Sequence, residues 1–347
     1  MKRYYLLTGA NGHLGHTIAA KLREAGEEVR GLVLPNDPHP APVLSGVELM
    51  EGDVCKPETL EPFFHVEPDE EGPREVVVIH TAGLISISSR RSDRVRAVNV
   101  EGTRNVVDMC MRHHVSRLVH VSSVHAIPEG KAGEPIVEAA RFDPGEVEGL
   151  YAKTKAEASQ LVLDAVKDGL DAVIVHPSGI LGPGDFGHGH LTQMITDYLN
   201  GRLVACVKGG YDFVDVRDVA DGVIAAAEKA RTGECYILSN RHYEVREILN
   251  TVSQQTGKKK IRVVLPMWLA KATAPLSELY YRLVRRPPLY TRYSLYTLTS
   301  NSCFCHRKAD EELGYRTRSM EATLRDTADF LIRHGRVRHP GRLCLQR

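Results

Sequence analysis

Short apolar runs alternate with amphipathic stretches over the first 180 residues, and this alternation constrains the fold more than any other feature. The apolar runs are Tyr4–Leu7, Val29–Leu34, Val47–Met50, Val76–His80, Leu118–Val121 and Ala172–Val175. The amphipathic stretches between and after them include HTIAAKLREAG, NVEGTRNVVDMCMRHH and AKTKAEASQLVLDAVKDG. Strands that alternate with helices of this length form βαβ units, and nearly continuous apolar strands are typical of parallel sheets covered on both faces. The sequence therefore predicts an α/β fold with a doubly wound, Rossmann-type parallel sheet.

The pattern loosens after Pro177. A glycine-rich loop, SGILGPGDFGHGH, is followed by a strand and helix in FVDVRDVADGVIAAAEKA and a further short strand in CYILS. Residues 265–299 are apolar and aromatic and are broken by prolines. We therefore expect a dinucleotide-binding domain at 1–177, continued by about 211–240. A smaller, mostly helical substrate lobe is expected at 178–210 and 241–335, followed by a frayed basic tail at 336–347.

Composition excludes several classes of function. The net charge of +1 provides no global field for nucleic acid. No stretch approaches the roughly 18 apolar residues of a membrane span, and the N-terminus does not resemble a signal peptide. Seven cysteines without a Cys-x-x-Cys pair favour reduced thiols and a cytoplasmic location. We expect no metal site, because Cys303, Cys305 and His306, or His188 and His190, lack further ligands at suitable spacing.

The first strand runs into TGANGHLG, which places Gly9, Gly12 and Gly15 between a strand and a helix. Glycines at this position permit a tight turn and a close backbone approach to a pyrophosphate at the helix N-terminus. The spacing differs from the G-x-G-x-x-G of many dinucleotide-binding enzymes, and a simple strand-to-helix turn is the alternative.

A second pattern is GLYAKTKAEA, in which Tyr151 precedes Lys155 by four residues. Residues at this spacing lie on the same face of a helix. An ammonium beside a phenol favours the phenolate and lowers the ordinary tyrosine pKa of about 10. The pair alone is also compatible with an ordinary helix face.

Together these motifs resemble the extended short-chain dehydrogenase/reductase family, also described as NAD-dependent epimerase/dehydratase-like. The serines that close LVHVSS (118–123) belong to the same combination. The resemblance continues through GDV (52–54), HTAG (80–83), NVEGT (99–103), HPSGILGPG (176–184), FVDVRDVA (213–220) and KADEELGY (308–315), with the motifs in family order. It covers nearly the whole chain. It is nearest in look to the dihydroflavonol reductase and 3β-hydroxysteroid dehydrogenase branch.

The resemblance implies a catalytic trio of Ser123, Tyr151 and Lys155, with Ser122 as the alternative serine. Tyr151 would exchange a proton with the substrate carbonyl or alcohol, Ser123 would hold the same oxygen, and Lys155 would also bind the nicotinamide ribose. The implied cofactor contacts are Gly9, Asn11, Gly12, His13, Leu14, Gly15, Asp53, Val54, Thr81, Ala82, Gly83, Asn99, Tyr151, Lys155, Pro177 and Ser178. For Asn99, a purely structural hydrogen bond at a helix start is an equal alternative.

The cofactor is expected to be NAD or NADP, with a slight preference for NAD. Val33 and Leu34 occupy the positions where the family carries an acid for NAD or an arginine for NADP. Asn36 or Asp37 is a candidate for reaching the ribose instead.

The resemblance and the apolar segment at 265–299 favour hydride transfer between nicotinamide and a ketone or secondary alcohol of a hydrophobic small molecule. The apolar body of the substrate is expected to extend toward the 180–190 loop and toward the 265–300 segment, which includes Trp268 and Tyr290. A nucleotide-sugar epimerase or dehydratase is the alternative, and a non-catalytic dinucleotide sensor is less favoured because the Tyr-Lys pair is present. The family also implies a homodimer built on helices at about Arg94–Arg112 and Tyr151–Lys167, with Val107, Leu161 and Val162 at its centre. Whether Arg285 and Arg286 meet an anionic part of the substrate stays open.

Overall fold

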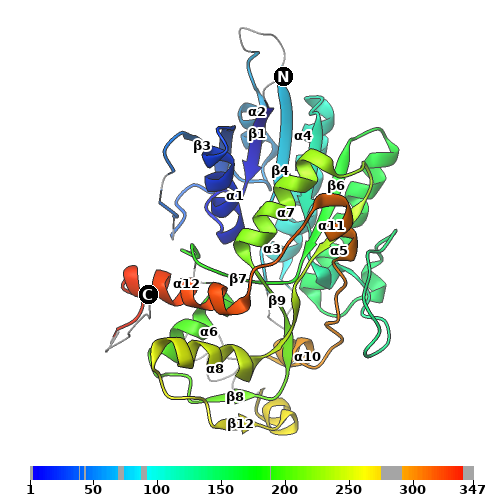
Figure 1. The fold of residues 1–347 in the computed structure, drawn as a ribbon. Coiled ribbons are helices and arrows are strands. Elements are labelled where there is room, and N and C mark those ends of the chain that lie inside the picture. Colours follow the sequence, from blue (N-terminus) through cyan, green and yellow to red (C-terminus); the bar gives the residue numbers. More distant parts are fainter. Residues whose placement is uncertain are drawn as a thin grey trace.

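The computed structural model describes residues 3–38, 40–42, 44–68, 74–86, 92–187, 189–274 and 291–338. Its centre is a seven-stranded sheet in the order β10-β6-β5-β4-β1-β2-β3, with every neighbouring pair parallel (Figure 1). The strands are β1 (Arg3–Thr8), β2 (Glu28–Val33), β3 (Val47–Glu51), β4 (Glu75–His80), β5 (Arg117–Val121), β6 (Ala172–Pro177) and β10 (Cys235–Leu238). The predicted doubly wound α/β fold is confirmed.

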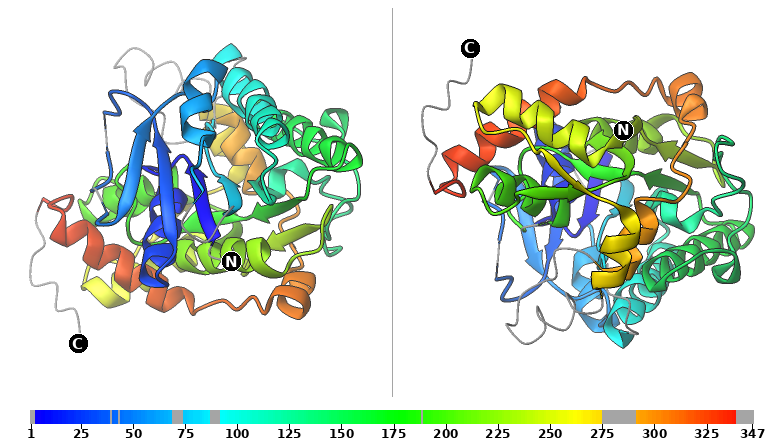
Figure 2. Two further views of the ribbon diagram at one scale, coloured as in Figure 1. Left: turned by 90° about the horizontal axis from the view of Figure 1, so that it is seen from above. Right: turned by 90° about the horizontal axis from the view of Figure 1, so that it is seen from below.

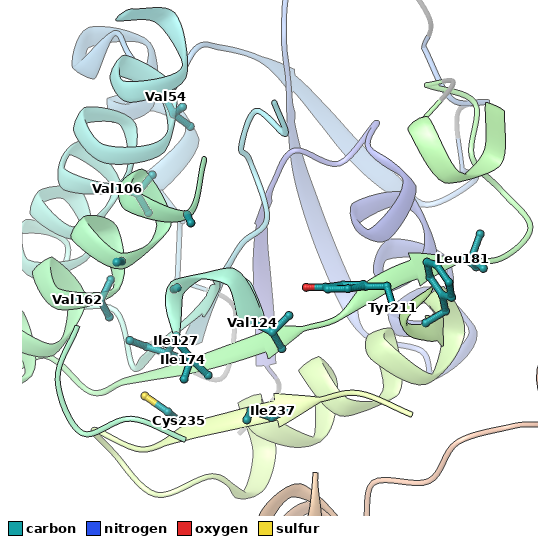
Figure 3. Packing of buried hydrophobic residues seen from close by; sticks show 14 of the residues in the cluster. Val54, Val106, Val124, Ile127, Val162, Ile174, Leu181, Tyr211, Cys235 and Ile237 are labelled. Atoms are coloured by element: carbon teal, nitrogen blue, oxygen red, sulfur yellow. The ribbon is translucent and has the colours of Figure 1, made fainter. Parts of the chain in front are cut away.

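Helices cover both faces of this sheet (Figure 2). One face carries α1 (His13–Glu24), α7 (Val216–Lys229) and α11 (Arg307–Leu313), whose apolar residues pack in one buried cluster. The other face carries α2 (Pro57–Phe64), α4 (Gly102–Arg112) and α5 (Leu150–Lys167), preceded by the single turn α3 (Asp93–Arg96) and a π-helical turn at Ala97–Glu101. Figure 3 shows part of this second cluster, where Val54, Val106 and Val162 lie among these helices and Ile174 and Ile237 project from the sheet.

The remaining elements form a lobe at the carboxyl ends of the strands, below the sheet in Figure 1. It contains a three-stranded sheet ordered β11-β9-β7, made of β7 (Gly179–Leu181), β9 (Gly210–Asp215) and β11 (Arg241–Glu244). A second sheet pairs β8 (Ala205–Val207) with β12 (Val263–Leu265). The helices are α6 (His190–Leu199), α8 (Val245–Thr256), a helix at 267–274, α10 (Arg292–Thr297) and α12 (Met320–Arg333). The domain boundaries expected from the sequence stay a proposal.

Polar contacts tie the last helix to the dinucleotide-binding half. Arg217 of α7 donates to Asp215 and to Asp326 of α12, at 2.7 Å in each case. Arg318 donates to Asp218 at 2.6 Å. α11 packs on α7 and β10, whereas α12 packs on α6 and α8. The two helices therefore belong to different halves.

Two details differ from the expectations. Val107 and Val162 are 5% and 0% exposed and belong to the core of the chain itself, so they cannot form the centre of a dimer interface. Leu161 is half-buried and packs against the same core. The start of the expected frayed tail is held in place, because Arg336 donates to the Asp185 carbonyl and the Arg338 amide donates to Asn200. Residues 339–347 lie outside the described residues.

In the described parts of the chain, none of the helices has the length and apolar character needed to cross a membrane. The same described residues contain no group of three or more His, Cys, Asp and Glu side chains arranged to hold a metal ion.

Candidate active site

The turn between β1 and α1 has the shape that a pyrophosphate requires. Gly9 has φ +71°, and a Cβ on Gly15 would lie 2.2 Å from the Gly9 carbonyl oxygen, so a side chain at Gly15 would collide with the turn. Gly12 is the N-cap of α1 and provides no side-chain cap to the first amides of the helix, which include His13 and Leu14. These residues fit a dinucleotide, because a bare helix start beside a close backbone turn offers N–H donors to phosphate oxygens.

The loop after β4 lies against this turn. The Thr81 hydroxyl donates to the Thr8 carbonyl at 2.7 Å, and the Ala82 amide donates to the Thr8 hydroxyl at 3.2 Å. A Cβ on Gly83 would lie 3.5 Å from the Lys155 Nζ, which brings the catalytic candidate next to this loop. Two motifs separated by about 70 residues therefore build one continuous surface at the carboxyl ends of neighbouring strands.

Asn99 makes structural hydrogen bonds, although not at a helix start, and its predicted cofactor contact stays a prediction. Its amide side chain accepts from the Leu84 amide at 2.8 Å and donates to the Leu84 carbonyl at 3.0 Å. It also donates to the Thr154 hydroxyl of α5 at 3.1 Å. Asn99 is 2% exposed, so it joins the loop after Gly83 to α5 from within the protein.

At the adenosine end, Asp53 and Val54 follow β3 by two and three residues. Asp53 accepts from the Cys55 amide at 2.9 Å, and buried Val54 packs against Gly102 of α4. Asp37 lies at the rim of the glycine turn, because Asn11 Nδ2 donates to its carboxylate at 3.3 Å. Of the two candidates named for the ribose, Asp37 therefore contacts the predicted cofactor site.

Ser123 and Ser122 at the end of β5 point to different partners. The Ser122 hydroxyl shares a 2.7 Å hydrogen bond with Ser159 inside α5. The Ser123 hydroxyl accepts from the His125 amide at 3.3 Å, and its hydrogen bonding with Tyr151 lowers the pKa of that phenol. Successive side chains alternate in direction at the end of a strand, which separates the two serines. The structure thus brings Ser123, rather than Ser122, to Tyr151.

Tyr151 and Lys155 are both buried on the inner face of α5, at 8% and 6% exposed. Burial raises the pKa of the Tyr151 phenol to about 12, against the opposing effect of Ser123. Burial also lowers the pKa of Lys155 to about 8, and its Nζ donates to the Val121 carbonyl at 2.8 Å. The expected lowering of the Tyr151 pKa by Lys155 is therefore not observed. Burial dominates, and the phenol is protonated at neutral pH.

Three buried histidines lie beneath this pair on adjacent strands, and the sequence reasoning did not single them out. His80 bridges the hydroxyls of Thr8 and Thr103, and the His176 Nδ1 contacts the Ser123 carbonyl oxygen at 3.0 Å. His120 lies between them, 5.4 Å from His80 by ring centroids. Burial and the Lys155 charge lower the pKa of all three, His80 to about 3 and His176 to about 4. They are neutral at physiological pH and offer Lys155 no counter-charge.

A group of aromatic rings surrounds the Tyr151 side chain. The His125 ring packs edge-to-face with Tyr151 at 6.0 Å, stacks on Tyr211 of β9 at 5.4 Å, and lies 6.1 Å from Tyr293 of α10. Gly149, at φ +92°, allows this packing, because a Cβ there would lie 2.2 Å from the Tyr293 ring. Burial lowers the pKa of His125 to about 4, so its ring is neutral. We call His125, Tyr211 and Tyr293 the aromatic collar.

A cavity of about 380 Å³ opens beside the collar. Its walls come from the residues after Ser123, the loop before α5, the strand β9, and α10 with the segment after it. They include His125, Ile127, Val147, Tyr211, Tyr296 and Phe304, together with Glu129, Glu146 and Glu148. A neighbouring cavity of about 390 Å³ is bounded by Asp212, Asn240 and residues 299–304. The lining is thus mixed rather than uniformly apolar.

The 265–300 segment lines the first cavity through Tyr296 and Ser300, whereas the 180–190 loop and Trp268 line neither cavity, and where the substrate binds stays a prediction. The loop packs on α1, since the His13 ring contacts the Pro183 carbonyl at 3.0 Å, and on α12 through the ring of Phe186. Trp268 is 70% exposed and lines neither cavity. His188, Arg285, Arg286 and Tyr290 lie outside the described residues.

Pro177 and Ser178 lie at the carboxyl end of β6. Pro177 ends β6, and both residues are buried. The Ser178 hydroxyl donates to Asp212 at 2.5 Å, so it turns toward β9. Burial raises the pKa of Asp212 to about 6 despite this hydrogen bond and one from the Asn240 amide.

The fold and the site define an NAD(P)-dependent Rossmann enzyme in which a buried Tyr-Lys pair adjoins the cofactor surface. The chain belongs to the NAD dependent epimerase/dehydratase family, whose model matches residues 5–245. It is thus an extended short-chain dehydrogenase/reductase, as the motifs indicated.

The chain is 31% identical over 338 residues to sterol demethylase protein B of Methylococcus capsulatus, covering 96% of this chain and 99% of that protein. It is 31% identical over 318 residues to a 4-hydroxy-2-methyl-3-oxo-4-farnesyl-3,4-dihydroquinoline-1-oxide ketoreductase of Stigmatella aurantiaca, covering 89% and 90%. The crystal structure of gox2253 superimposes with a TM-score of 0.81 at 31% identity, covering 96% of this chain and 99% of that one. Other relatives are named for dihydroflavonol and 3beta-hydroxysteroid substrates, and solved structures of the same fold contain NAD.

Proposed function

We propose that the protein is an NAD-dependent oxidoreductase that interconverts a ketone and a secondary alcohol on a hydrophobic small molecule. One observation carries the proposal: the Ser123 hydroxyl hydrogen-bonds with the buried Tyr151 phenol, and the Lys155 Nζ lies next to Gly83 in the loop after β4. When bound, the nicotinamide supplies or accepts the hydride. The chain's own residues hold the substrate oxygen and move its proton.

Tyr151 is the proton donor in this proposal, and Ser123 holds the carbonyl oxygen. The raised pKa of about 12 keeps the phenol protonated at neutral pH, which favours the direction in which a carbonyl is reduced. The nearby Lys155 cation stabilises negative charge as the proton leaves. The neutral His125 ring and the tyrosines of the aromatic collar exclude water and provide flat apolar surface for the substrate body.

The names of the relatives support a hydrophobic substrate, because sterol and farnesylated ketone are both large apolar molecules. The alternative, a nucleotide-sugar epimerase, is less favoured by the cavity. Its walls include Glu129, Glu146 and Glu148, whose carboxylates repel a sugar-nucleotide diphosphate.

NAD is preferred over NADP in this proposal because of Asp37. Its carboxylate lies at the rim of the glycine turn beside Asn11, where a 2′-phosphate would meet a like charge. Val33 and Leu34 provide no guanidinium to bind that phosphate.

The test is a matched set of variants assayed for NADH oxidation with steroid, flavonoid and farnesylated ketones. Tyr151→Phe and Ser123→Ala should lower kcat, the former by roughly 10²–10⁴, with NADH affinity retained. Tyr236→Phe in β10 and Ser122→Ala, which remove hydroxyls outside the site, should retain activity. Tyr151→Phe turnover close to that of the wild type would refute the proposal, as would conversion of UDP-sugars but not of ketones by the wild type.

A further inference from the structure

Trp268 belongs to an exposed apolar surface that lines neither of the two cavities. This surface is the tip of the lobe, at the bottom of Figure 1, where β8 and β12 lie. The side chains of Val204, Val263 and Trp268 are 74%, 54% and 70% exposed. They come from the residue before β8, from the first residue of β12 and from the helix at 267–274, and the β8–β12 pairing holds the first two segments side by side. We call these three side chains the apolar tip.

The tip is ordered by contacts on its inner side. Ala270 and Ala274 of the 267–274 helix are fully buried against Leu295 of α10. The opposite side of that helix exposes Trp268 and Lys271. Outward exposure of the tryptophan therefore follows from the helical period and from an anchored inner face.

Cationic residues flank the apolar tip in the sequence. Residues 257–274 contain Lys258, Lys259, Lys260, Arg262 and Lys271 and no Asp or Glu. Residues 201–208 add Lys208 and Arg202, and Arg202 donates to Asp197 at 3.3 Å. The lysine run is fixed by its backbone, since the Lys258 and Lys259 carbonyls accept from Ser253 and from Tyr198 at 2.6 and 3.0 Å. The side chains of Lys259, Lys260, Arg262 and Lys271 are exposed.

We propose that the apolar tip docks on an anionic lipid surface. An exposed tryptophan and two exposed valines, flanked in sequence by exposed cations, match the interface of a bilayer. There indole and aliphatic groups enter the headgroup boundary while cations meet lipid phosphates. Two other partners fit less well. Val204 and Val263 gain nothing from nucleotide bases, and a second copy of the tip would bring two cationic rims together. The docking lays the protein on the surface and spans nothing.

The chain has one tryptophan, so its fluorescence reports directly on the proposed contact. Phosphatidylcholine–phosphatidylglycerol vesicles should shift Trp268 emission to shorter wavelength, and brominated lipids should quench it. Pure phosphatidylcholine should bind more weakly. Because each surface Lys contributes roughly fivefold to partitioning on anionic lipid, Lys259→Ala/Lys260→Ala should weaken binding about 25-fold. Lys271→Ala provides a second, single-site variant.

The matched control is Lys56→Ala/Lys229→Ala, which removes two exposed lysines from the dinucleotide-binding half. It should bind vesicles like the wild type, while circular dichroism and NADH binding verify that every variant is folded. Trp268→Ala should reduce co-sedimentation with mixed vesicles. The proposal is overturned if mixed vesicles leave the emission unchanged or if the control loses as much binding as the lysine-run variants. It is also overturned if a single-stranded oligonucleotide, or self-association without lipid, produces the same shift at lower concentration.

Discussion

Lys155 is a buried cation whose charge costs stability, and replacing it should make the fold more stable while it removes the proposed catalytic lysine. Burial lowers its pKa from 10.5 to about 8, which corresponds to about 3 kcal/mol at 1.36 kcal/mol per pH unit. Lys155→Met keeps the side-chain length and removes the charge. It also loses the hydrogen bond to the Val121 carbonyl, a cost of about 1 kcal/mol. We expect a net gain of about 2 kcal/mol near pH 6.

The pH dependence identifies the cause. Between pH 8 and 10.5 the unfolded chain still binds a proton at Lys155 and the folded chain does not, so the wild type gains stability as the pH rises. The variant lacks this gain, and its advantage should disappear near pH 10. The raised pKa of Tyr151 acts only above pH 10, where folded protein retains the proton longer and loses stability, and it is common to both proteins.

Urea unfolding followed by circular dichroism, at several values between pH 6 and pH 10, measures this difference. Lys153→Met is the matched control, because Lys153 lies two residues away on the same helix and is exposed. It should leave the curve of unfolding free energy against pH unchanged. The reasoning is refuted if Lys155→Met is less stable than the wild type at pH 6 and its curve of unfolding free energy against pH runs parallel to the wild-type curve. Burial of the Lys155 charge would then not destabilise the fold.

Two further predictions concern selectivity and assembly. The wild type should have a higher kcat/KM with NADH than with NADPH. Asp37→Asn should reduce that preference at least tenfold, because it removes a charge that repels the 2′-phosphate. An unchanged ratio of the two kcat/KM values would place the determinant elsewhere. If α4 and α5 form the dimer contact, Leu161→Glu in α5 should convert the protein to monomers in sedimentation velocity, whereas the wild type should sediment as a dimer at micromolar concentration. A monomeric wild type would contradict this.

The sequence predicted the elements whose signals are local. Six apolar runs became the first six strands of the sheet because parallel strands are buried on both faces and read as continuous apolar segments. The glycine turn and the Tyr-Lys pair could be recognised for the same reason, because each depends only on residues close together in the sequence.

The aromatic collar could not be predicted in this way. His125, Tyr211 and Tyr293 come from a 3-10 turn, a strand and a helix that are separated by more than 80 residues of sequence in each step, and no spacing relates them. The direction of the Tyr151 pKa was also misjudged, because a motif shows that a cation is near but not how deeply the phenol is buried. Val107 and Val162 were placed at an interface because the family resemblance indicates which helices would pair but not which of their apolar residues face the core of the chain itself.

The position of β10 at one edge of the central sheet has a consequence for how the chain is made. β6 pairs with β5 on one side, but its other partner, β10, and the helix α7 that packs over it are encoded after β7, β8 and β9. During synthesis, at about 5–20 residues per second, the nascent chain therefore exposes the apolar edge of β6 for several seconds. The same order means that a gene truncated after Pro177 encodes an open sheet with one face partly bare. The dinucleotide-binding half is therefore complete only when the chain continues past Leu238 through α11, which covers the same face of the sheet.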